Sequence, residues 1–493
     1  MERLDKDLLS VQETRNLVNN SKKAQEIFKT FSQEKVDRIV KAVAAAAEAN
    51  AVQLAKMAWE ETGFGLWKDK IIKNQFASRT VYENIRNLKT VGIIREDKVN
   101  KFFEVAVPVG VVAALIPSTN PTSTTIYKTL ISLKSGNGIV ISPHPNAKNC
   151  IIETAKILNE AAVKEGAPEG LIGCITIPSL KATDELMKHE YTSLILATGG
   201  EAMVRAAYSS GTPAIGVGPG NGPAYIDKTA DVSLAVKRIM DSKTFDNGLI
   251  CASEQSIVVE NSIKEIVKNE LVKQGAYFLS KEESDKLGKF ILGANGLMNP
   301  KIVGKSVEYL ASMAGINVTS DVRVLISEQS TVGHDNPYSM EKLTPILAFY
   351  TVKDVQEGIK LCTEILMNEG KGHSMMLHTE DEELVKEFGL KIPVSRLMVN
   401  TPGALGGIGG TTNLVPALTL GCGAVGGSST SDNVGPLNLF NIRRVAYGVR
   451  ELEDLKDSKS MDNETIIQPA MSEAHIELII SKVVEKLINL NKQ

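Results

Sequence analysis

The chain has 493 residues, of which 43% are hydrophobic, and its 55 basic side chains nearly balance 58 acidic ones. This length predicts two or three domains, and the charge balance argues against an electrostatic nucleic-acid binder. No apolar run approaches the roughly 20 residues of a membrane helix, the charged start lacks the apolar region of a secretory signal, and five cysteines without framework spacing indicate reduced thiols, so we expect a cytoplasmic protein.

The first half of the chain predicts helices and then alternating strands and helices. Residues 11–62 are predicted to be helical, since Val36, Ile39, Val40 and Val43 recur at helical spacing. A hairpin follows at 92–108. A helix should begin near Pro121, because proline suits the first helical position. Strands are expected at 110–117, 138–142, 171–178, 193–200 and 213–218. This alternation is typical of a doubly wound parallel sheet.

A second α/β segment is predicted over residues 228–425, with a strand at 396–400 and a glycine-rich run at 401–429 that we interpret as loops near a site. The matching G-x-G-x-x-G of Gly421, Gly423 and Gly426 is rejected as a dinucleotide fingerprint, because too little chain follows it to build a βαβ unit. The turn at 198–200 is a better place for a phosphate, since it ends a strand and opens a helix.

The last stretch differs in composition. Residues 451–470 are mostly polar and charged, like a linker, and an amphipathic helix is predicted to follow. Its apolar stripe consists of Ile476, Ile479, Ile480, Val483, Val484, Leu487 and Ile488. The helix could dock on its own core or on a sister subunit, or it could detach and bind another protein; the tether favours the second interpretation.

The five cysteines have different contexts. Cys150, Cys174 and Cys362 lie in apolar helix or strand patterns and are interpreted as structural, whereas Cys422 in its glycine-rich loop stays open. Cys251 follows a turn and precedes an apolar run, and sites gather at such element boundaries. The six histidines are scattered without a metal-ligand pairing, so no metal site is predicted.

Six stretches stand out along the chain: "IPSTNPTSTTIYKTLISLKSGNGIVISPHPNAK", "ATGG", "GVGPGNGPAYID", "FDNGLICASEQS", "EKLTPIL" and "LTLGCGAVGGSSTSDNVGP". In this order, over roughly residues 10–450, they resemble the CoA-acylating branch of the aldehyde dehydrogenase superfamily. That branch includes the acetaldehyde and propionaldehyde dehydrogenases of bacterial microcompartments and the N-terminal half of bifunctional aldehyde–alcohol dehydrogenases.

The resemblance implies a chemistry for named residues. Cys251 would attack the aldehyde as thiolate, and the Asn120 amide with the Cys251 backbone N–H would stabilise the oxyanion. Hydride would leave to NAD, and coenzyme A would take the acyl group from the resulting thioester. Glu341 would hold the nicotinamide ribose. The remaining cofactor residues implied are Ile116, Pro117, Ser118, His144, Thr198, Gly199, Gly200 and Gly218. Without the resemblance, Asn120 is a helix N-cap, Glu341 a solvated acid and His144 a plain loop residue.

Two departures from the hydrolytic members are informative. Val217 stands where they carry a glutamate base, and without that base water is poorly activated, while a thiol needs less help. The missing acid therefore favours transfer to coenzyme A. At the adenosine end, Ser142 and Pro145 replace a lysine and a glutamate, so the preference for NAD over NADP rests on the branch and not on these residues.

The implied fold is aldehyde dehydrogenase-like, with two doubly wound α/β domains and a small β oligomerisation element. Residues 1–227 would form the cofactor-binding domain with the 92–108 hairpin, 228–425 the catalytic domain, 426–450 the return to the cofactor domain with an oligomerisation strand, 451–470 the linker and 471–493 the amphipathic helix. A homodimer or homotetramer is expected. Residues 471–490 resemble an encapsulation peptide, which predicts a shell or cargo partner and packaging inside a microcompartment.

The substrate expected from the branch is acetaldehyde or propionaldehyde. The alternative is sulfoacetaldehyde or succinate semialdehyde, which would need an added cation such as Arg396 or Lys371. A non-catalytic scaffold is a third hypothesis, and the joint presence of Cys251, Asn120 and Glu341 speaks against it. The sequence leaves open the aldehyde chain length, the physiological direction and the group that deprotonates Cys251.

Overall fold

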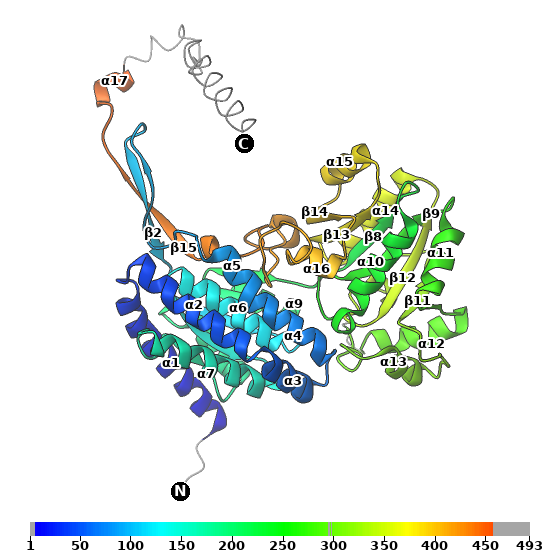
Figure 1. The fold of residues 1–493 in the computed structure, drawn as a ribbon, viewed down its shortest axis with the longest axis horizontal. Helices are drawn as coiled ribbons and strands as arrows, with labels where there is room; N and C mark the ends of the chain where they lie inside the picture. The colour runs from blue at the N-terminus through cyan, green and yellow to red at the C-terminus, as the bar shows by residue number, and fades with distance from the viewer. Residues whose placement is uncertain (1–4, 294–295, 297, 457–493) are drawn as a thin grey trace, which may run out of the picture. The chain divides into compact units, whose positions relative to one another are not determined.

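The structure, a computed structural model shown in Figure 1, describes residues 5–293, 296 and 298–456. The chain divides into two compact units, Met1–Ile94 with Glu104–Arg443 and Arg95–Phe103 with Arg444–Gln493. Among the described residues, no helix combines the length and the apolar character that crossing a membrane requires. The candidate site lies wholly within the first unit.

Helices open the chain, as the periodicity of residues 11–62 predicts. The side chains of Val36, Ile39, Val40 and Val43 are all buried, and Ser32 caps their helix by accepting from the Lys35 N–H. The elements are α1 (Lys6–Phe28), α2 (Gln33–Ala49), α3 (Ala51–Thr62), α4 (Trp67–Gln75), the π-helical turn η1 (Phe76–Thr80) and α5 (Val81–Ile85).

A five-stranded parallel sheet follows, in the order β5-β4-β3-β6-β7. Its strands are β3 (Val111–Ile116), β4 (Gly138–Pro143), β5 (Ile172–Cys174), β6 (Thr192–Thr198) and β7 (Ala214–Val217), and its helices are α6 (Pro121–Lys134), α7 (Lys148–Lys164), α8 (Leu180–Lys188) and α9 (Glu201–Ser209). β3 is buried on both faces: Val112 and Ala114 pack with α2, α6 and α7, while Val111 and Ala113 pack with α1, α8 and α9. The strand predicted at 171–178 is shorter, because the Thr176 and Ile177 N–H groups donate to the Glu13 carboxylate and not to a neighbouring strand.

The second half forms a seven-stranded sheet in the order β10-β11-β12-β9-β8-β13-β14, again with parallel neighbours. Its strands are β8 (Gly222–Ile226), β9 (Glu254–Glu260), β10 (Ala276–Phe278), β11 (Val324–Glu328), β12 (Ile346–Val352), β13 (Gly372–His378) and β14 (Val394–Val399). Its helices are α10 (Val232–Thr244), α11 (Lys264–Lys273), α12 (Lys281–Ile291), α13 (Val307–Ala314), α14 (Val355–Asn368), α15 (Glu382–Lys391) and α16 (Gly403–Gly407). Both faces are covered, since Val258 packs in one hydrophobic cluster and its neighbours Ile257 and Val259 in another.

Two doubly wound α/β sheets are therefore present, which confirms the predicted fold class. The chain changes sheet between β7 and β8, ahead of residue 227; the domain boundaries themselves stay a prediction. Both strands are short, apolar and buried, and sequence pattern alone does not say which sheet a buried strand joins.

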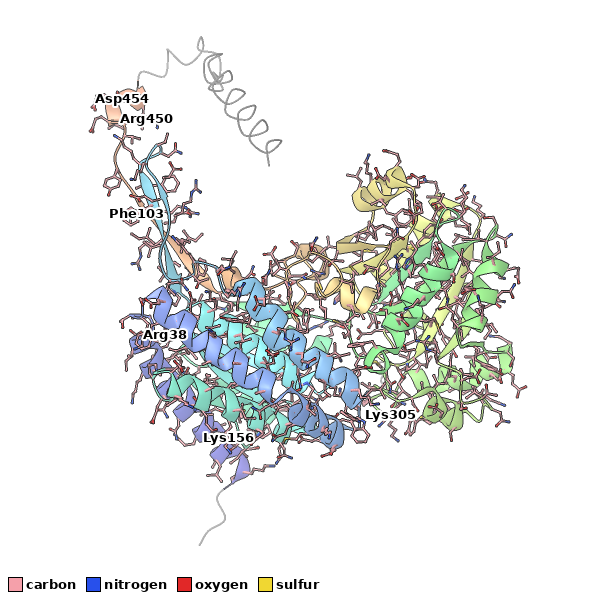
Figure 2. The ribbon with its side chains drawn as sticks, in the orientation of Figure 1. Arg38, Phe103, Lys156, Lys305, Arg450 and Asp454 are labelled. Atoms are coloured by element: carbon pink, nitrogen blue, oxygen red, sulfur yellow. The ribbon has the colours of Figure 1, made fainter. Side chains whose placement is uncertain are left out.

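Hydrogen bonds join the two halves at the turn between α3 and α4. Lys305, which is labelled in Figure 2, precedes α13, and its ammonium group donates to the carbonyl of Gly63 at 2.9 Å. The N–H of Gly65 donates to the carbonyl of Gly304 at 2.9 Å. These bonds tie the first helices of the chain to the half that carries the seven-stranded sheet.

A third sheet has the order β1-β2-β15 and consists of β1 (Gly92–Asp97), β2 (Phe102–Pro108) and β15 (Phe440–Ala446). The hairpin predicted at 92–108 and the strand predicted within 426–450 agree with these bounds; their part in oligomerisation stays a prediction. Upstream of β15, Val434 and Leu439 pack in the hydrophobic cluster of β3 and β4. Of the predicted linker 451–470 the structure describes 451–456, which include α17 (Leu452–Lys456); the helix predicted at 471–493 lies outside the described residues.

Candidate active site

A cavity of about 660 Å³ lies where the carboxyl ends of β3 and β6 face the turn that precedes β9. Parallel α/β sheets bind ligands at this edge of their strands. All eleven site residues expected from the sequence line this one cavity: Ile116, Pro117, Ser118, Asn120, His144, Thr198, Gly199, Gly200, Gly218, Cys251 and Glu341. Their individual roles stay predictions.

Cys251 lies between the 3₁₀ turn η3 (Phe245–Gly248) and β9. Within that turn Asp246 and Asn247 have φ values of 49° and 53°, a left-handed conformation that Asp and Asn tolerate better than most residues. The turn leaves Cys251 half-buried at the cavity wall. The other four cysteines do not line the cavity, which agrees with a structural interpretation of Cys150, Cys174 and Cys362.

The thiol of Cys251 is held in its neutral form. Burial raises the pKa of Cys251 to about 12, the carboxyl group of Glu341 adds to the shift, and the guanidinium of Arg396 opposes it. A thiol needs a positive neighbour or a helix N-terminus to become a ready thiolate. In the ligand-free protein, these surroundings favour the neutral thiol over the thiolate.

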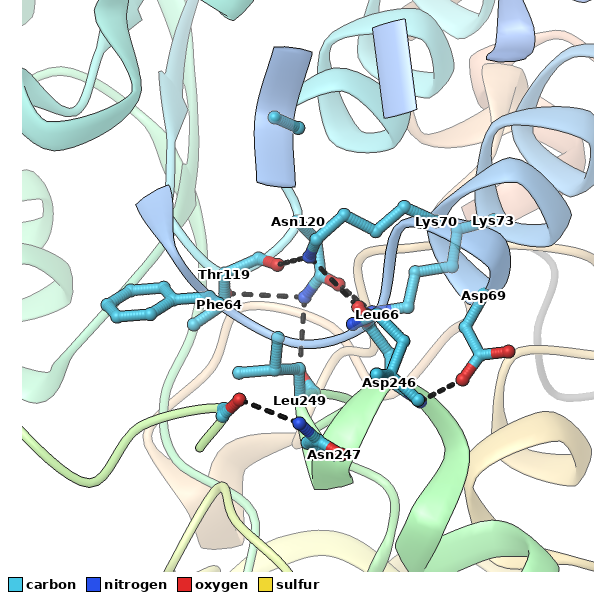
Figure 3. A network of polar contacts seen from close by, with 12 residues as sticks. Phe64, Leu66, Asp69, Lys70, Lys73, Thr119, Asn120, Asp246, Asn247 and Leu249 are labelled. Carbon is cyan, nitrogen blue, oxygen red and sulfur yellow. Dashed lines mark hydrogen bonds and ion pairs between the residues drawn. The ribbon is translucent and has the colours of Figure 1, made fainter. Parts of the chain in front are cut away.

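Asn120 occupies the N-cap position of α6, but its side chain makes no capping bond. Instead its Nδ2 donates to the carbonyl of Leu249 at 3.2 Å, two residues before Cys251. Its Oδ1 accepts a hydrogen bond of 2.5 Å from Nζ of Lys73. Asn120 is therefore the N-cap of α6 by position, as predicted, but its carboxamide faces the cysteine turn and does not cap the helix (Figure 3).

A buried ion cluster, which we call the lysine–aspartate cluster, lies behind Asn120 and consists of Lys70, Lys73, Asp246 and Asp69 (Figure 3). The side chains of Lys70 and Lys73 are 3% exposed and that of Asp246 is 0% exposed. Both ammonium groups contact Oδ2 of Asp246, Lys70 at 3.0 Å. Asp69 accepts from the Asp246 N–H at 2.7 Å. Sequence reasoning missed this cluster, because lysines at i and i+3 in "KDKIIK" have the pattern of a solvated helix face.

Nucleotide binding has a suitable cradle at the end of β6. Gly200 is the N-cap of α9 and provides no side-chain cap, so the first N–H groups of the helix stay available. A Cβ atom built on Gly200 or Gly218 would meet nothing within 4 Å, and Thr198 Oγ1 is buried without a partner among the described residues. An open cradle and an unpaired hydroxyl fit the phosphate or ribose of a dinucleotide.

The opposite end of this cradle holds His144 and Ser142. Nδ1 of His144 accepts from the Asn146 N–H at 3.1 Å, and burial lowers the pKa of this imidazole. The Ser142 hydroxyl bonds that of Thr183 at 2.9 Å. Among the described residues that line the cavity, Glu341 is the carboxylic acid, so this end has no acid for a ribose 2′-hydroxyl.

Glu341 is 7% exposed, and its Oε1 accepts from the Gly220 N–H at 2.8 Å. Burial, reinforced by Glu369, raises the pKa of Glu341 to about 8. In the ligand-free protein this carboxyl group is thus protonated at neutral pH and does not behave as a solvated loop acid.

Apolar side chains form the wall near Cys251. Leu249, Val303 and Leu343 form a small hydrophobic cluster with Phe64 and Met298, and all five line the cavity. Val217 stands buried in the same wall where a hydrolytic base would be. No lysine or arginine lines the cavity among the described residues.

The two cations suggested for an anionic substrate have other surroundings. Arg396 donates to the carbonyl of Ser431 at 3.1 Å and to Oδ1 of Asn433 at 3.2 Å, and Lys371 is exposed. Neither lines the cavity.

His373 is a further residue that sequence reasoning did not select. A Cβ atom built on Gly220 would lie 2.0 Å from the Cys251 carbonyl oxygen and 3.3 Å from Cε1 of His373, so the imidazole is a close neighbour of the cysteine backbone. Burial lowers the pKa of His373 to about 3, which keeps the ring neutral. Within the described ranges, no group of three or more His, Cys, Asp or Glu side chains could hold a metal ion.

The sequence and fold of the chain are similar to those of known proteins. The profile of the aldehyde dehydrogenase family matches residues 7–287. The bifunctional aldehyde-alcohol dehydrogenase of Escherichia coli K12 is 45% identical over 89% of this chain and 50% of its own length, so the chain spans about half of such relatives. The acetylating succinate-semialdehyde dehydrogenase of Clostridium kluyveri is 36% identical over 89% of this chain and 96% of its own length. A sulfoacetaldehyde dehydrogenase of Acholeplasma is 38% identical over 87% of this chain and 90% of its own length.

Solved structures agree. A probable aldehyde dehydrogenase from Listeria monocytogenes is 64% identical, with a TM-score of 0.91 over 92% of this chain and 100% of its own. An acetylating aldehyde dehydrogenase from Geobacillus thermoglucosidasius is 53% identical, with a TM-score of 0.90 over 91% and 99%. A propionaldehyde dehydrogenase from a fucose utilisation microcompartment of Clostridium phytofermentans is 28% identical, with a TM-score of 0.80 over 88% and 97%.

Proposed function

Because the chain belongs to the aldehyde dehydrogenase family, we propose that it oxidises a small aldehyde to an acyl-coenzyme A thioester with NAD as hydride acceptor. One observation carries the proposal: Cys251 and Asn120 share a cavity with the open cradle of Thr198, Gly199 and Gly200. A nucleophile, an oxyanion donor and a place for a nucleotide are the three parts that this reaction needs.

The side chains act in sequence. The Cys251 sulfur attacks the aldehyde carbon and loses its proton, and the Asn120 carboxamide N–H with the Cys251 backbone N–H stabilise the oxygen as it gains negative charge. A bound nicotinamide ring supplies the hydride acceptor. Loss of hydride leaves a thioester on Cys251, and Glu341 would hold the nicotinamide ribose in the orientation this transfer requires.

Release of the acyl group follows from what the cavity wall provides. Val217 cannot take a proton from water, so hydrolysis of the thioester is unassisted. The thiol of coenzyme A, already a few per cent thiolate near pH 7, attacks the thioester carbon instead. The acyl group moves to coenzyme A, and Cys251 regains a proton.

The apolar wall supports a short uncharged aldehyde, acetaldehyde or propionaldehyde. Succinate semialdehyde and sulfoacetaldehyde are the substrates named for two relatives, and each carries an anion that would be left unpaired in a wall without lysine or arginine among its described residues. We therefore favour the uncharged aldehydes, with the anionic ones as competing candidates.

The test is NADH formation by the full chain with NAD, coenzyme A and a panel of these four aldehydes. We expect turnover to require coenzyme A, to favour the uncharged aldehydes and to vanish in Cys251→Ala. Replacing NAD with NADP in the same assay settles the cofactor preference. Release of free acid at the same rate without coenzyme A would refute acyl transfer, and NADH formation by Cys251→Ala would refute the proposed nucleophile.

Assembly is proposed on separate grounds. The 92–108 hairpin and the β15 strand support a homodimer or homotetramer, which light scattering of the purified chain would measure.

Residues 471–490 form an amphipathic stripe in the sequence, and a structural neighbour comes from a bacterial microcompartment. We propose that this segment binds a shell or cargo protein, so that deleting 460–493 keeps activity but abolishes encapsulation in a microcompartment. Co-purification of the truncated enzyme with shells would refute this role.

A further inference from the structure

Asn120 can stabilise an oxyanion only while its NH₂ group faces the substrate. A carboxamide is nearly symmetric in shape, and a turn of 180° about its last bond would present the oxygen instead. The orientation of this one side chain therefore decides whether the site contains a donor or an acceptor at the position where negative charge develops.

Two neighbours fix that orientation. Lys73 has donors and no acceptor, so its contact at 2.5 Å pairs with the Asn120 oxygen. The carbonyl of Leu249 has an acceptor and no donor, so its contact at 3.2 Å pairs with the NH₂ group. The second N–H reaches the Thr119 hydroxyl at 3.3 Å, and a hydroxyl can give way to an incoming oxyanion because it rotates.

From this geometry we infer that Lys73 is a positioning residue for the reaction, which holds the Asn120 carboxamide with its NH₂ group turned toward the Cys251 turn. The inference rests on the proposed function. Lys73 acts through Asn120, since its own side chain does not line the cavity.

Lys73 can hold this position as a cation because its charge is compensated. Its ammonium group contacts the Asp246 carboxylate, and burial lowers the pKa of Lys73 to about 8 while Asp246 opposes that shift. Asp246 is itself fixed by the Leu66 N–H at 2.6 Å. This close approach needs Gly65, since a Cβ atom there would lie 1.9 Å from Oδ1 of Asp246 and the φ of +67° also suits glycine.

The chain offers a matched control in Lys70. It lies one turn earlier on α4, has the same 3% exposure and contacts the same carboxylate at 3.0 Å. Its other contact is the Thr119 carbonyl at 3.4 Å, and no contact joins it to the Asn120 side chain. Lys70→Met and Lys73→Met thus remove equivalent buried charges, but only the second frees the carboxamide.

The experiment follows the burst of NADH after mixing with aldehyde and NAD in the absence of coenzyme A, which reports formation of the thioester. Removal of an oxyanion donor costs about 10²–10³-fold in rate, so we expect Lys73→Met, which only loosens that donor, to slow the burst by about 10–100-fold. Lys70→Met should stay within about threefold of the unmodified chain at a similar thermal midpoint. Lys73→Arg, still a donor-only cation, should recover at least about fivefold over Lys73→Met.

The Asn120→Ala background separates positioning from a structural role. If Lys73 acts through Asn120, adding Lys73→Met to Asn120→Ala changes the burst by less than about threefold, because contacting residues are not additive. Equal bursts for Lys70→Met and Lys73→Met, or the same loss with and without Asn120, would overturn the inference alone. No burst from the unmodified chain, or a burst that survives Cys251→Ala, would overturn the proposed function and the inference with it.

Discussion

Removing the central carboxylate of the lysine–aspartate cluster should be far more damaging than removing the whole cluster. Asp246 is fully buried and accepts from Lys70, Lys73 and the Leu66 N–H. Asp246→Asn keeps the shape but leaves two buried ammonium groups with the Asp69 carboxylate as compensation. Breaking a buried pair from one side costs about 3–5 kcal/mol. With an m value of about 3 kcal/mol/M in urea, this lowers the unfolding midpoint by about 1–1.7 M.

The comparison variant combines Asp246→Asn with Lys70→Met and Lys73→Met, so both buried ammonium groups are removed with the carboxylate and only the half-buried Asp69 keeps its charge. Replacing a complete buried ion cluster by apolar groups is often close to neutral, and we expect at least half of the lost midpoint to return. Urea unfolding followed by tryptophan fluorescence suits this test, because the two tryptophans, Trp59 and Trp67, lie on α3 and at the start of α4. A triple variant no more stable than Asp246→Asn alone would contradict the electrostatic argument.

Three further outcomes are expected. Asn120→Ala should lower the NADH burst rate by about 10²–10³-fold with unchanged urea stability; a smaller loss than fivefold would exclude it as the oxyanion donor. The rate of alkylation of ligand-free Cys251 by iodoacetamide should rise about tenfold per pH unit from pH 7 to 9, because the thiolate fraction rises tenfold per unit below a pKa of about 12. Mass spectrometry of the labelled peptide measures this rate. A rate that levels off below pH 8 would show a stabilised thiolate instead. Gly200→Ala should raise the KM for NAD severalfold at unchanged thermal midpoint, since its Cβ enters open cavity space, whereas Gly389→Ala, equally open but on α15 and away from the cavity, should leave that KM unchanged.

The predictable part of the site depends on local sequence pattern. Thr198 ends a buried apolar strand and the two glycines after it open a helix, which is enough to predict a nucleotide cradle at that turn. The turn before Cys251 likewise has a recognisable Asp-Asn-Gly. Neither pattern says that the two features meet across one cavity; this expectation came from family resemblance, because contact between two sheets depends on long-range packing.

The lysine–aspartate cluster was unpredictable for the same reason. A buried lysine looks like a solvated one until the residue that neutralises it is known, and Asp246 lies 173 residues from Lys73 in the chain. The sheet that β8 joins is equally hard to predict, since its burial pattern fits either sheet. Tertiary packing, and not local periodicity, determines which sheet a short buried strand joins and which distant charges pair.

The position of the cluster suggests a use for its three buried charged groups, Lys70, Lys73 and Asp246. Asn120 follows the last strand residues of β3, whereas Cys251 precedes β9, so the proposed nucleophile and the proposed oxyanion donor adjoin different sheets. A shift of 1 Å between such groups can cost about 10²-fold in rate. Apolar packing resists compression but has little directional preference, whereas the ammonium group of Lys73 bonds Asn120 and Asp246 along fixed directions. Since Asp246 is in the turn that leads to Cys251, this one side chain ties the donor of one sheet to the nucleophile of the other.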